Sequence, residues 1–206
     1  MQVSMKSLQG GCHHEIGTHM VRFCNNHLQS WHCSGPHYDK RYAMGLSEVY
    51  GAELQGTEEG LAVINGFFEQ PIQSLYYGAL HYYTAIQAHR MDFVDLYRHL
   101  ERFVSCPERR WRQVVRIRKG VRDQREAGAF RNDQAYFAGA VDLLRSRRTI
   151  NFRELHCAKI SLRDYRQKLK GHIRMNGCII PPFLHDMQKY GEHLDSVAEQ
   201  NFVDED

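Results

Sequence analysis

The histidine pair in the stretch HEIGTH places the strongest constraint on how this chain can fold. His14 and His19 are five residues apart, and Glu15 directly follows the first histidine. At 3.6 residues per turn, side chains four residues apart lie about 40° apart around a helix, but side chains five residues apart lie roughly 140° apart. Both imidazoles can therefore face one metal ion only if the helix is widened. A π-bulge, which adds one residue to a turn and occurs mostly at functional sites, would widen it, and Gly17 would tolerate that distortion most easily.

Spacing alone leaves two interpretations of this stretch open. In one, His14 and His19 bind a metal ion, and Glu15 stands where the zinc-peptidase motif H-E-x-x-H carries its general base. Glu58 and Glu59, at an expected helix start, then offer the third ligand of a His-His-Glu site. In the other, a core histidine and a surface histidine lie near each other by chance, in a chain with 13 histidines.

Composition restricts the class of protein. The chain has 206 residues, 42% hydrophobic and 25% charged, which predicts one globular domain over residues 1–206. It contains no long apolar run, and its first residues lack the pattern of a secretory signal, so we expect a cytoplasmic protein that does not span a membrane. Six cysteines without a C-x-x-C pair indicate reduced thiols rather than a disulfide framework or a zinc ribbon.

Hydrophobic periodicity predicts a mainly α fold with little sheet. Asp92 and Pro107 are expected to begin helices, and Ser161 with Asp164 forms a capping-box start. Thr57 is expected as the N-cap of another helix, after an irregular insertion over residues 30–56 that is rich in glycine. The expected helices cover approximately residues 14–28, 57–68, 72–90, 92–104, 107–119, 133–148, 162–170 and 183–200.

A basic block follows Pro107. Such a block is usually a solvated helix face, but it can also contact an acidic partner. No nucleic-acid-binding motif accompanies it, so we expect no nucleic-acid partner. The block comprises Arg109, Arg110, Arg112, Arg116, Arg118, Lys119, Arg122 and Arg125.

A different zinc site is a minor alternative. Cys12, Cys24, His32, Cys33 and His37 are potential ligands near the HEIGTH stretch. Their spacings match no standard structural zinc finger.

The stretch HEIGTH, followed by TEEGLAVIN, resembles the microtubule-associated tyrosine carboxypeptidase family. The likeness continues through YYTAIQAHRMDF, RWRQVVRIRKG, FRNDQAYFAGAVDLLRSRRTINF and PPFLHDMQKYGEHL, and so covers nearly all of the chain after His14. It implies a zincin-like metallopeptidase domain whose zinc ion is held by His14, His19 and Glu59, with Glu15 as the base. Glu58 stays open as the third ligand instead of Glu59, because adjacent helical residues diverge by about 100° and only one can face the metal.

The resemblance also implies an activity and a substrate. The family suggests a carboxypeptidase that removes a C-terminal tyrosine from the acidic tail of α-tubulin on microtubules. A terminal carboxylate is well bound by a basic side chain, and Arg116, Arg118 and Lys119 are the candidates in a basic pattern similar to the family's. Tyr136 is a candidate donor to the developing oxyanion, with a place in the core as the alternative.

Two features differ from the family. Its members have a substantial part of the catalytic domain before the zinc helix, whereas this chain has thirteen residues before His14. We therefore expect the N-terminal part of the domain to be missing here. Residues 30–56 also differ from the family's shorter segment. The alternative function is a catalytically incomplete fragment that only binds microtubules or another acidic partner.

Overall fold

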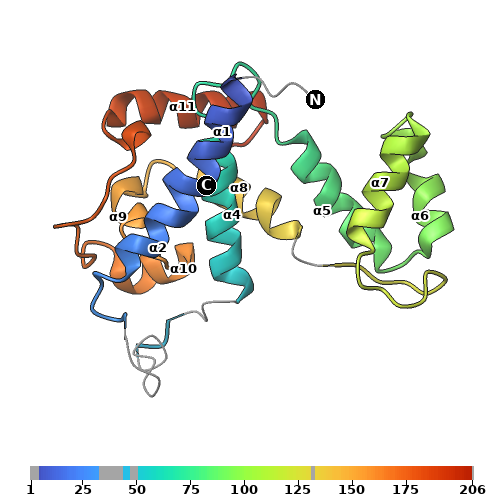
Figure 1. The fold of residues 1–206 in the computed structure, drawn as a ribbon, viewed down its shortest axis with the longest axis horizontal. Coiled ribbons are helices and arrows are strands. Elements are labelled where there is room, and N and C mark those ends of the chain that lie inside the picture. The colour runs from blue at the N-terminus through green and yellow to red at the C-terminus, as the bar shows by residue number, and fades with distance from the viewer. Residues whose placement is uncertain (1–4, 33–43, 47–50, 131–132, 206) are drawn as a thin grey trace. The chain divides into compact units, whose positions relative to one another are not determined.

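The computed structural model describes residues 5–32, 44–46, 51–130 and 133–205. Within these ranges the chain contains helices and no strand, which confirms the prediction of a mainly α protein for the described residues (Figure 1). The zincin-like topology stays a prediction. None of the described helices is both long enough and apolar enough to cross a bilayer.

In chain order the elements are α1 (Met5–His14), the π-helix η1 (Glu15–Met20), α2 (Val21–Asn26), α4 (Ala52–Gly66), α5 (Tyr76–Ala88), α6 (Phe93–His99), the 3₁₀ turn η2 (Leu100–Arg102), α7 (Pro107–Ile117), α8 (Gln134–Arg145), α9 (Phe152–His156), α10 (Leu162–Asp164), the π-helix η3 (Tyr165–Leu169), the 3₁₀ turn η4 (Pro182–Leu184) and α11 (Met187–Gln200).

The helices divide into two compact units. The first comprises residues 1–74 and 139–206, and the second comprises residues 75–138, so the boundary falls within α8. Two compact units can belong to one domain, and the single-domain expectation therefore stays a prediction.

Close helix crossings in the first unit depend on glycine. A Cβ on Gly10 of α1 would lie 2.7 Å from the carbonyl oxygen of Gly66 at the end of α4. A Cβ on Gly139 of α8 would lie 1.8 Å from the carbonyl oxygen of Gly56 on α4. Because real Cβ contacts are much longer, both crossings bring backbone against backbone and hold α4 between α1 and α8.

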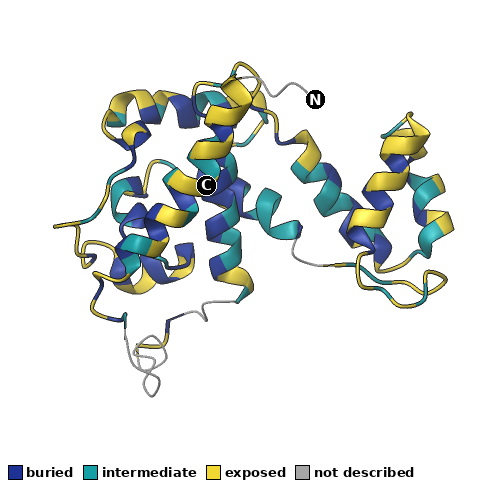
Figure 2. Ribbon diagram, in the orientation of Figure 1, coloured by how far each residue is buried: buried dark blue, intermediate teal, exposed yellow. Residues whose placement is uncertain are grey.

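Polar side chains that follow η1 fix the zinc-motif helix to the rest of the first unit. The Asn25 amide donates to the carbonyl oxygens of His156 and Ile179, at 3.0 and 2.8 Å. The Gln29 amide donates to the carbonyl oxygens of Cys157 and Arg174, at 2.7 and 2.9 Å. Figure 2 shows that α4 is made of buried and half-buried residues, with exposed residues only at its start, as expected for a helix covered on more than one side.

The second unit has a separate hydrophobic core. Its buried members come from α5, α6, η2 and α7. Asp92 caps α6 by accepting a hydrogen bond from the Asp95 amide, and Pro107 occupies the first turn of α7. Both predicted helix starts are confirmed. The core residues are Leu80, Ala85, Ala88, Leu96, Leu100, Val114 and Ile117.

Other local predictions have mixed outcomes. The Ser161 cap is confirmed, because its hydroxyl accepts from the Asp164 amide. Thr57 as an N-cap is wrong: α4 begins five residues earlier, at Ala52, and the Thr57 hydroxyl donates to the Glu53 carbonyl within the helix. The last part of the expected insertion over 30–56 is accordingly helical, and much of the remainder lies outside the described residues. The five cysteines within the described ranges are free thiols, as predicted.

Candidate functional site

The HEIGTH stretch forms a π-helix. Residues Glu15–Met20 have π geometry between α1 and α2, which confirms the predicted widening. The Thr18 hydroxyl donates to the His13 carbonyl at 2.8 Å and accepts from the buried amide of Asn65 on α4, also at 2.8 Å. Gly17 has a further role, because a Cβ there would lie 2.8 Å from the ring of Phe183. The widened turn is thus fixed from α4 and from η4.

The π-helix brings the motif side chains together. The rings of His14 and His19 lie 5.2 Å apart between centroids. His14, Glu15 and His19 each offer a ligand atom, and these atoms lie within 4.8 Å of one another. Both imidazoles are a quarter exposed, whereas the Glu15 side chain is 73% exposed and lies with Oε1 3.8 Å from His14 Nε2. Two partly exposed histidines with a solvated carboxylate beside them form a candidate metal centre.

Glu59 supplies an acceptor that no protein group satisfies. Its Oε2 lies 3.6 Å from His19 Nε2 and is buried without a hydrogen-bond partner among the described residues. A buried carboxylate oxygen is costly to leave unpaired, so an orphaned one next to an imidazole nitrogen fits a cation ligand. The residues present therefore fit a zinc ion of the His-His-Glu type.

Glu58 is fully engaged by the protein. Its Oε1 accepts a short hydrogen bond from Nη1 of Arg22 on α2. Its Oε2 lies 3.2 Å from His19 Nδ1 and 3.7 Å from the Lys159 ammonium. Arg22 has no exposed surface, and its other donors reach the carbonyl oxygens of Leu155, Ala158 and Ile160.

The electrostatics of these residues suit a cation. The carboxylates of Glu58 and then Glu59, which face the two nitrogens of the ring, raise the pKa of His19 to about 9. Burial lowers the pKa of His14, and the positive charge of His19 adds to that effect. Burial alone would raise the pKa of Glu58, but Arg22 and His19 outweigh it and keep the carboxyl ionised, with a pKa below its ordinary value. α4 therefore places negative charge directly behind His19.

The alternative metal group finds no support in the described residues. Within them, the one group of three or more potential ligands whose atoms all lie within 4.8 Å of one another is His14, Glu15 and His19, and it contains neither a cysteine nor His32. Cys33 and His37 lie outside the described residues.

The predicted carboxylate-binding residues all lie in the second unit, and their environments differ. Arg118 is buried, and its guanidinium donates to the Gln124 side chain and to carbonyl oxygens of the loop that follows α7, including those of Glu126 and Gly128. Because this geometry commits its donors to the loop, we correct its expected role to a structural one. Arg116 makes a bidentate pair with Asp133, at 2.7 and 3.0 Å.

Lys119 and Tyr136 lie at the end of α7 and on α8. Lys119 is exposed beyond the end of α7, and Tyr136 is half-buried on α8. Both fall in the second unit, which is described by itself.

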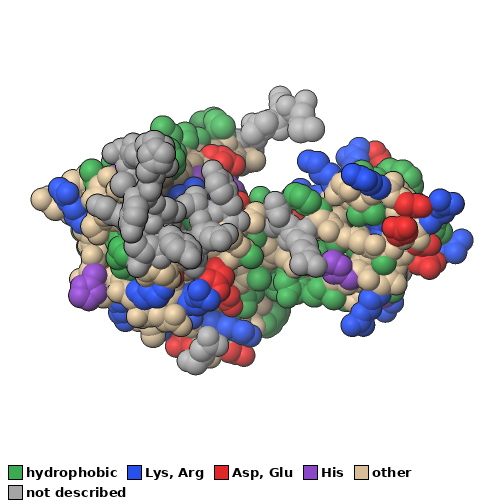
Figure 3. All heavy atoms as spheres, turned by 90° about the horizontal axis from the view of Figure 1, so that it is seen from below, with side chains coloured by type: hydrophobic (Ala, Val, Ile, Leu, Met, Phe, Trp, Pro, Cys, Tyr) green, Lys and Arg blue, Asp and Glu red, His purple; other side chains and the backbone are tan. Residues whose placement is uncertain are grey.

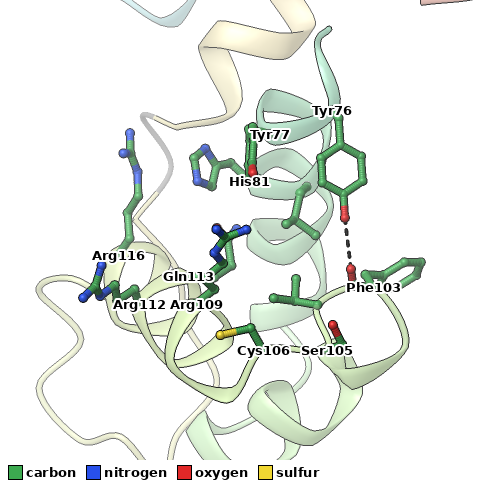
Figure 4. A pocket seen from close by; sticks show the side chains of 12 residues that line it. Tyr76, Tyr77, His81, Phe103, Ser105, Cys106, Arg109, Arg112, Gln113 and Arg116 are labelled. Atoms are coloured by element: carbon green, nitrogen blue, oxygen red, sulfur yellow. Dashed lines mark hydrogen bonds between the residues drawn. The ribbon is translucent and has the colours of Figure 1, made fainter. Parts of the chain in front are cut away.

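Arg116 also lines a pocket of about 430 Å³ between α5 and α7 (Figure 4). Arg109, Arg112 and Arg116 line it from α7, opposite Tyr77 and His81 on α5. Among the described residues, none that lines it is acidic. Lys and Arg side chains are also prominent on the face of this unit seen in Figure 3. A basic pocket with aromatic walls suits a ligand that carries both carboxylate and apolar groups.

Comparison with known proteins identifies relatives of the chain. No protein-family profile matches it. It is 37% identical over 201 residues to microtubule-associated tyrosine carboxypeptidase 1 of Homo sapiens, an alignment that covers 96% of this chain and 40% of the relative. It is 36% identical to the Rattus norvegicus protein of the same name, with the same coverage, and 36% identical over 195 residues to the putative tyrosine carboxypeptidase MATCAP2 of Homo sapiens, covering 94% of this chain and 36% of the relative.

The chain is homologous to the microtubule-associated tyrosine carboxypeptidases. The resemblance stated from the motifs is therefore confirmed, and it spans nearly the whole chain. The chain itself spans about 40% of the length of the tyrosine carboxypeptidase 1 relatives.

Three residues around the HEIGTH motif of this carboxypeptidase homologue were not anticipated from its sequence. Thr18 and Asn65 fix the π-helix, and Arg22 holds Glu58. Arg22 was detectable in principle, because it is the one charged residue in the stretch HMVRFCNN. A cation in such a stretch on the motif helix points to a buried partner.

Proposed function

We propose that this chain carries the catalytic centre of a zinc-dependent carboxypeptidase that removes a C-terminal tyrosine. The observation that carries the proposal is the π-helix, because it gives a five-residue histidine spacing the geometry of a shared metal site. His14, His19 and Glu59 would hold the zinc ion, and the homology to tyrosine carboxypeptidases supplies the reaction.

The proposed chemistry assigns separate tasks to zinc and to Glu15. Zinc bound at this site would polarise the scissile carbonyl and make water acidic enough to be deprotonated near neutral pH. Glu15 is the solvated carboxylate beside His14 and can accept the proton of the attacking water. It then returns that proton to the leaving amine, so the carboxylate is regenerated in each cycle.

Substrate recognition is proposed for the second unit. Arg116 and Lys119 are the candidates for the terminal carboxylate, and Tyr136 is the candidate donor to the oxyanion. The arginine-lined pocket offers Arg109 to an acidic ligand, whereas Arg112 is paired with Glu108. The acidic tail of α-tubulin, in the cytoplasm and on microtubules, is the substrate that this charge pattern and the names of the relatives favour.

The first experiment measures the zinc content of the purified chain. We expect one zinc ion per chain in the parent, and loss of zinc in His19→Ala and Glu59→Ala. Glu53→Ala is the matched control, because Glu53 is exposed in the first turn of the same helix, away from the site. Zinc retained in both site variants would refute the ligand assignment.

Activity is tested separately with peptides that end in tyrosine. Glu15→Gln should keep zinc and lose tyrosine release, because the variant removes the proton acceptor and no metal ligand. The alternative function, a fragment that only binds microtubules or another acidic partner, predicts binding without hydrolysis in the parent and unchanged binding in Glu15→Gln. Tyrosine release by the zinc-loaded parent would exclude that alternative.

A further inference from the structure

Helix α4 contacts both histidines of the proposed metal centre. The His14 ring lies next to the backbone of Ala62, and His19 Nδ1 lies 3.2 Å from Glu58 Oε2. Relative to Glu58, Ala62 lies about 40° around the helix and Glu59 about 100° around it. One helix therefore lies against both histidines and carries Glu58, which contacts His19, together with the proposed third ligand.

Orientation matters because an imidazole binds a metal through one nitrogen while the other carries the proton. A hydrogen bond from Nδ1 to a carboxylate fixes the proton there and leaves the Nε2 lone pair for the metal. In His19 the contact on Nδ1 is Glu58, and Nε2 is the nitrogen that lies near Glu59 Oε2, at 3.6 Å. The two carboxylates thus meet opposite nitrogens of the same ring.

Arg22 makes Glu58 a rigid partner. Its side chain has no exposed surface, and its Nε and Nη2 donate to the carbonyl oxygens of Leu155, Ala158 and Ile160 at 2.9 to 3.1 Å. Its Nη1 holds Glu58 Oε1. The position of the Glu58 carboxylate is therefore set by the backbone of residues 155–160, through a guanidinium that cannot rotate without losing several hydrogen bonds.

We propose that Glu58 is a positioning residue for His19, held in place by Arg22, and is not a metal ligand. The inference rests on the proposed zinc site and goes beyond it, since it names the residues that select the tautomer and ring orientation of one ligand. Carboxylates that orient a ligating histidine typically change metal affinity by 10- to 100-fold when they are removed. The same assignment leaves Glu59, with its unpartnered oxygen, as the third ligand.

The test measures zinc affinity by competition with a chromogenic chelator. We expect Glu58→Gln to bind one zinc ion about 10- to 100-fold more weakly than the parent. Arg22→Lys should weaken binding in the same direction, because an ammonium group cannot replace the forked contacts of the guanidinium. Cobalt-substituted Glu58→Gln should keep the visible absorption of the cobalt-substituted parent, because the number of ligands is unchanged.

Thr57→Val is the matched control for a purely structural effect. Thr57 is buried next to Glu58 on α4, and its hydroxyl accepts from the Leu162 amide at 2.8 Å. The variant should lower the melting temperature and leave zinc affinity within about twofold of the parent. If Glu58→Gln lowers the melting temperature alone and keeps the zinc affinity of the parent, the positioning role is refuted.

Two further outcomes separate this inference from the proposed function. Loss of zinc in Glu58→Gln with retention in Glu59→Gln would make Glu58 the ligand and overturn the inference, while the zinc site would stand. A folded parent that binds no zinc would overturn the proposed function and the inference with it. This outcome needs only the zinc measurement on the parent and no variant.

Discussion

The glycine crossing of α4 and α8 gives a stability prediction that can be derived from distances. A Cβ on Gly139 would lie 1.8 Å from the Gly56 carbonyl oxygen and 2.6 Å from its carbon. Ordinary contacts of a Cβ begin near 3.4 Å. The two helices would have to separate by more than 1 Å, and no side chain can rotate away, because the obstacle is backbone.

Separation of these helices would also loosen buried side chains next to the crossing. Leu61 of α4 and Leu143 of α8 have no exposed surface. Overpacking of a core costs about 1–3 kcal/mol and occasionally more, and alanine regains about 1 kcal/mol over glycine within a helix. Because backbone blocks both sides here, we take the upper end of that range and expect Gly139→Ala to lower the free energy of unfolding by about 2 kcal/mol after that gain.

Urea unfolding, followed by far-ultraviolet circular dichroism, measures this effect. The matched control is Gly56→Ala on the opposing helix, where a Cβ would have no neighbour within 4 Å. That variant should raise stability by about 0.5–1 kcal/mol through helix propensity alone. A Gly139→Ala protein as stable as the parent would refute the reasoning, since it would mean that the crossing is looser than the structure has it.

Three other predictions concern buried and exposed charges. Burial is the main reason why the pKa of His156 falls from 6.5 to about 3. Between these two pH values the unfolded chain binds one more proton than the folded chain. The contribution of His156 to the free energy of unfolding is therefore fully present above pH 6.5 and falls by about 1.4 kcal/mol for each pH unit below it. His156→Gln should remove this pH dependence from the free energy of unfolding measured with urea. Arg118→Met should lower the free energy of unfolding by about 2–3 kcal/mol and make residues 121–128 sensitive to limited proteolysis, because their carbonyl oxygens lose the donors of the guanidinium. A loop that stays resistant to proteolysis would show that other donors hold these oxygens. Arg109→Glu should weaken binding of a labelled Glu-rich peptide ending in tyrosine by about tenfold at low salt, whereas Arg90→Glu, exposed outside the pocket, should change it less than twofold; equal losses in the two variants would show that net charge, not the pocket, governs binding.

The sequence predicted those features whose cause is local. The widened turn followed from the spacing of His14 and His19, because helix geometry leaves one way to bring them together. The starts at Asp92 and Pro107 followed from capping chemistry, which acts within a few residues.

Features that depend on distant contacts were not predictable. α1 starts well before His14 even though Gly10 and Gly11 resemble a helix breaker, because Gly10 sits against the backbone of α4. Thr57 resembles a cap but lies inside α4 and serves the distant amide of Leu162. Arg118 belongs to a basic block, and its burial depends on how the following loop wraps around it.

The choice between Glu58 and Glu59 also required the tertiary structure. Both are acidic, and they are adjacent in sequence. What separates them is Arg22, which lies 36 residues away and satisfies one carboxylate while the other keeps a buried oxygen without a hydrogen bond.

The extra residue in the π-helix acts as a phase shift for everything downstream. Relative to an uninterrupted α-helix, it rotates all later positions by about 100°, and the contacts of Arg22, Asn25 and Gln29 depend on that rotation. Because the π-helix absorbs the extra residue within one turn, deleting one residue between the histidines, with a return to α geometry, would restore the commoner H-E-x-x-H spacing and leave these three side chains facing the same carbonyl partners. At this turn, the five-residue and four-residue spacings can therefore be exchanged by a single insertion or deletion without turning the interior contacts of the helix.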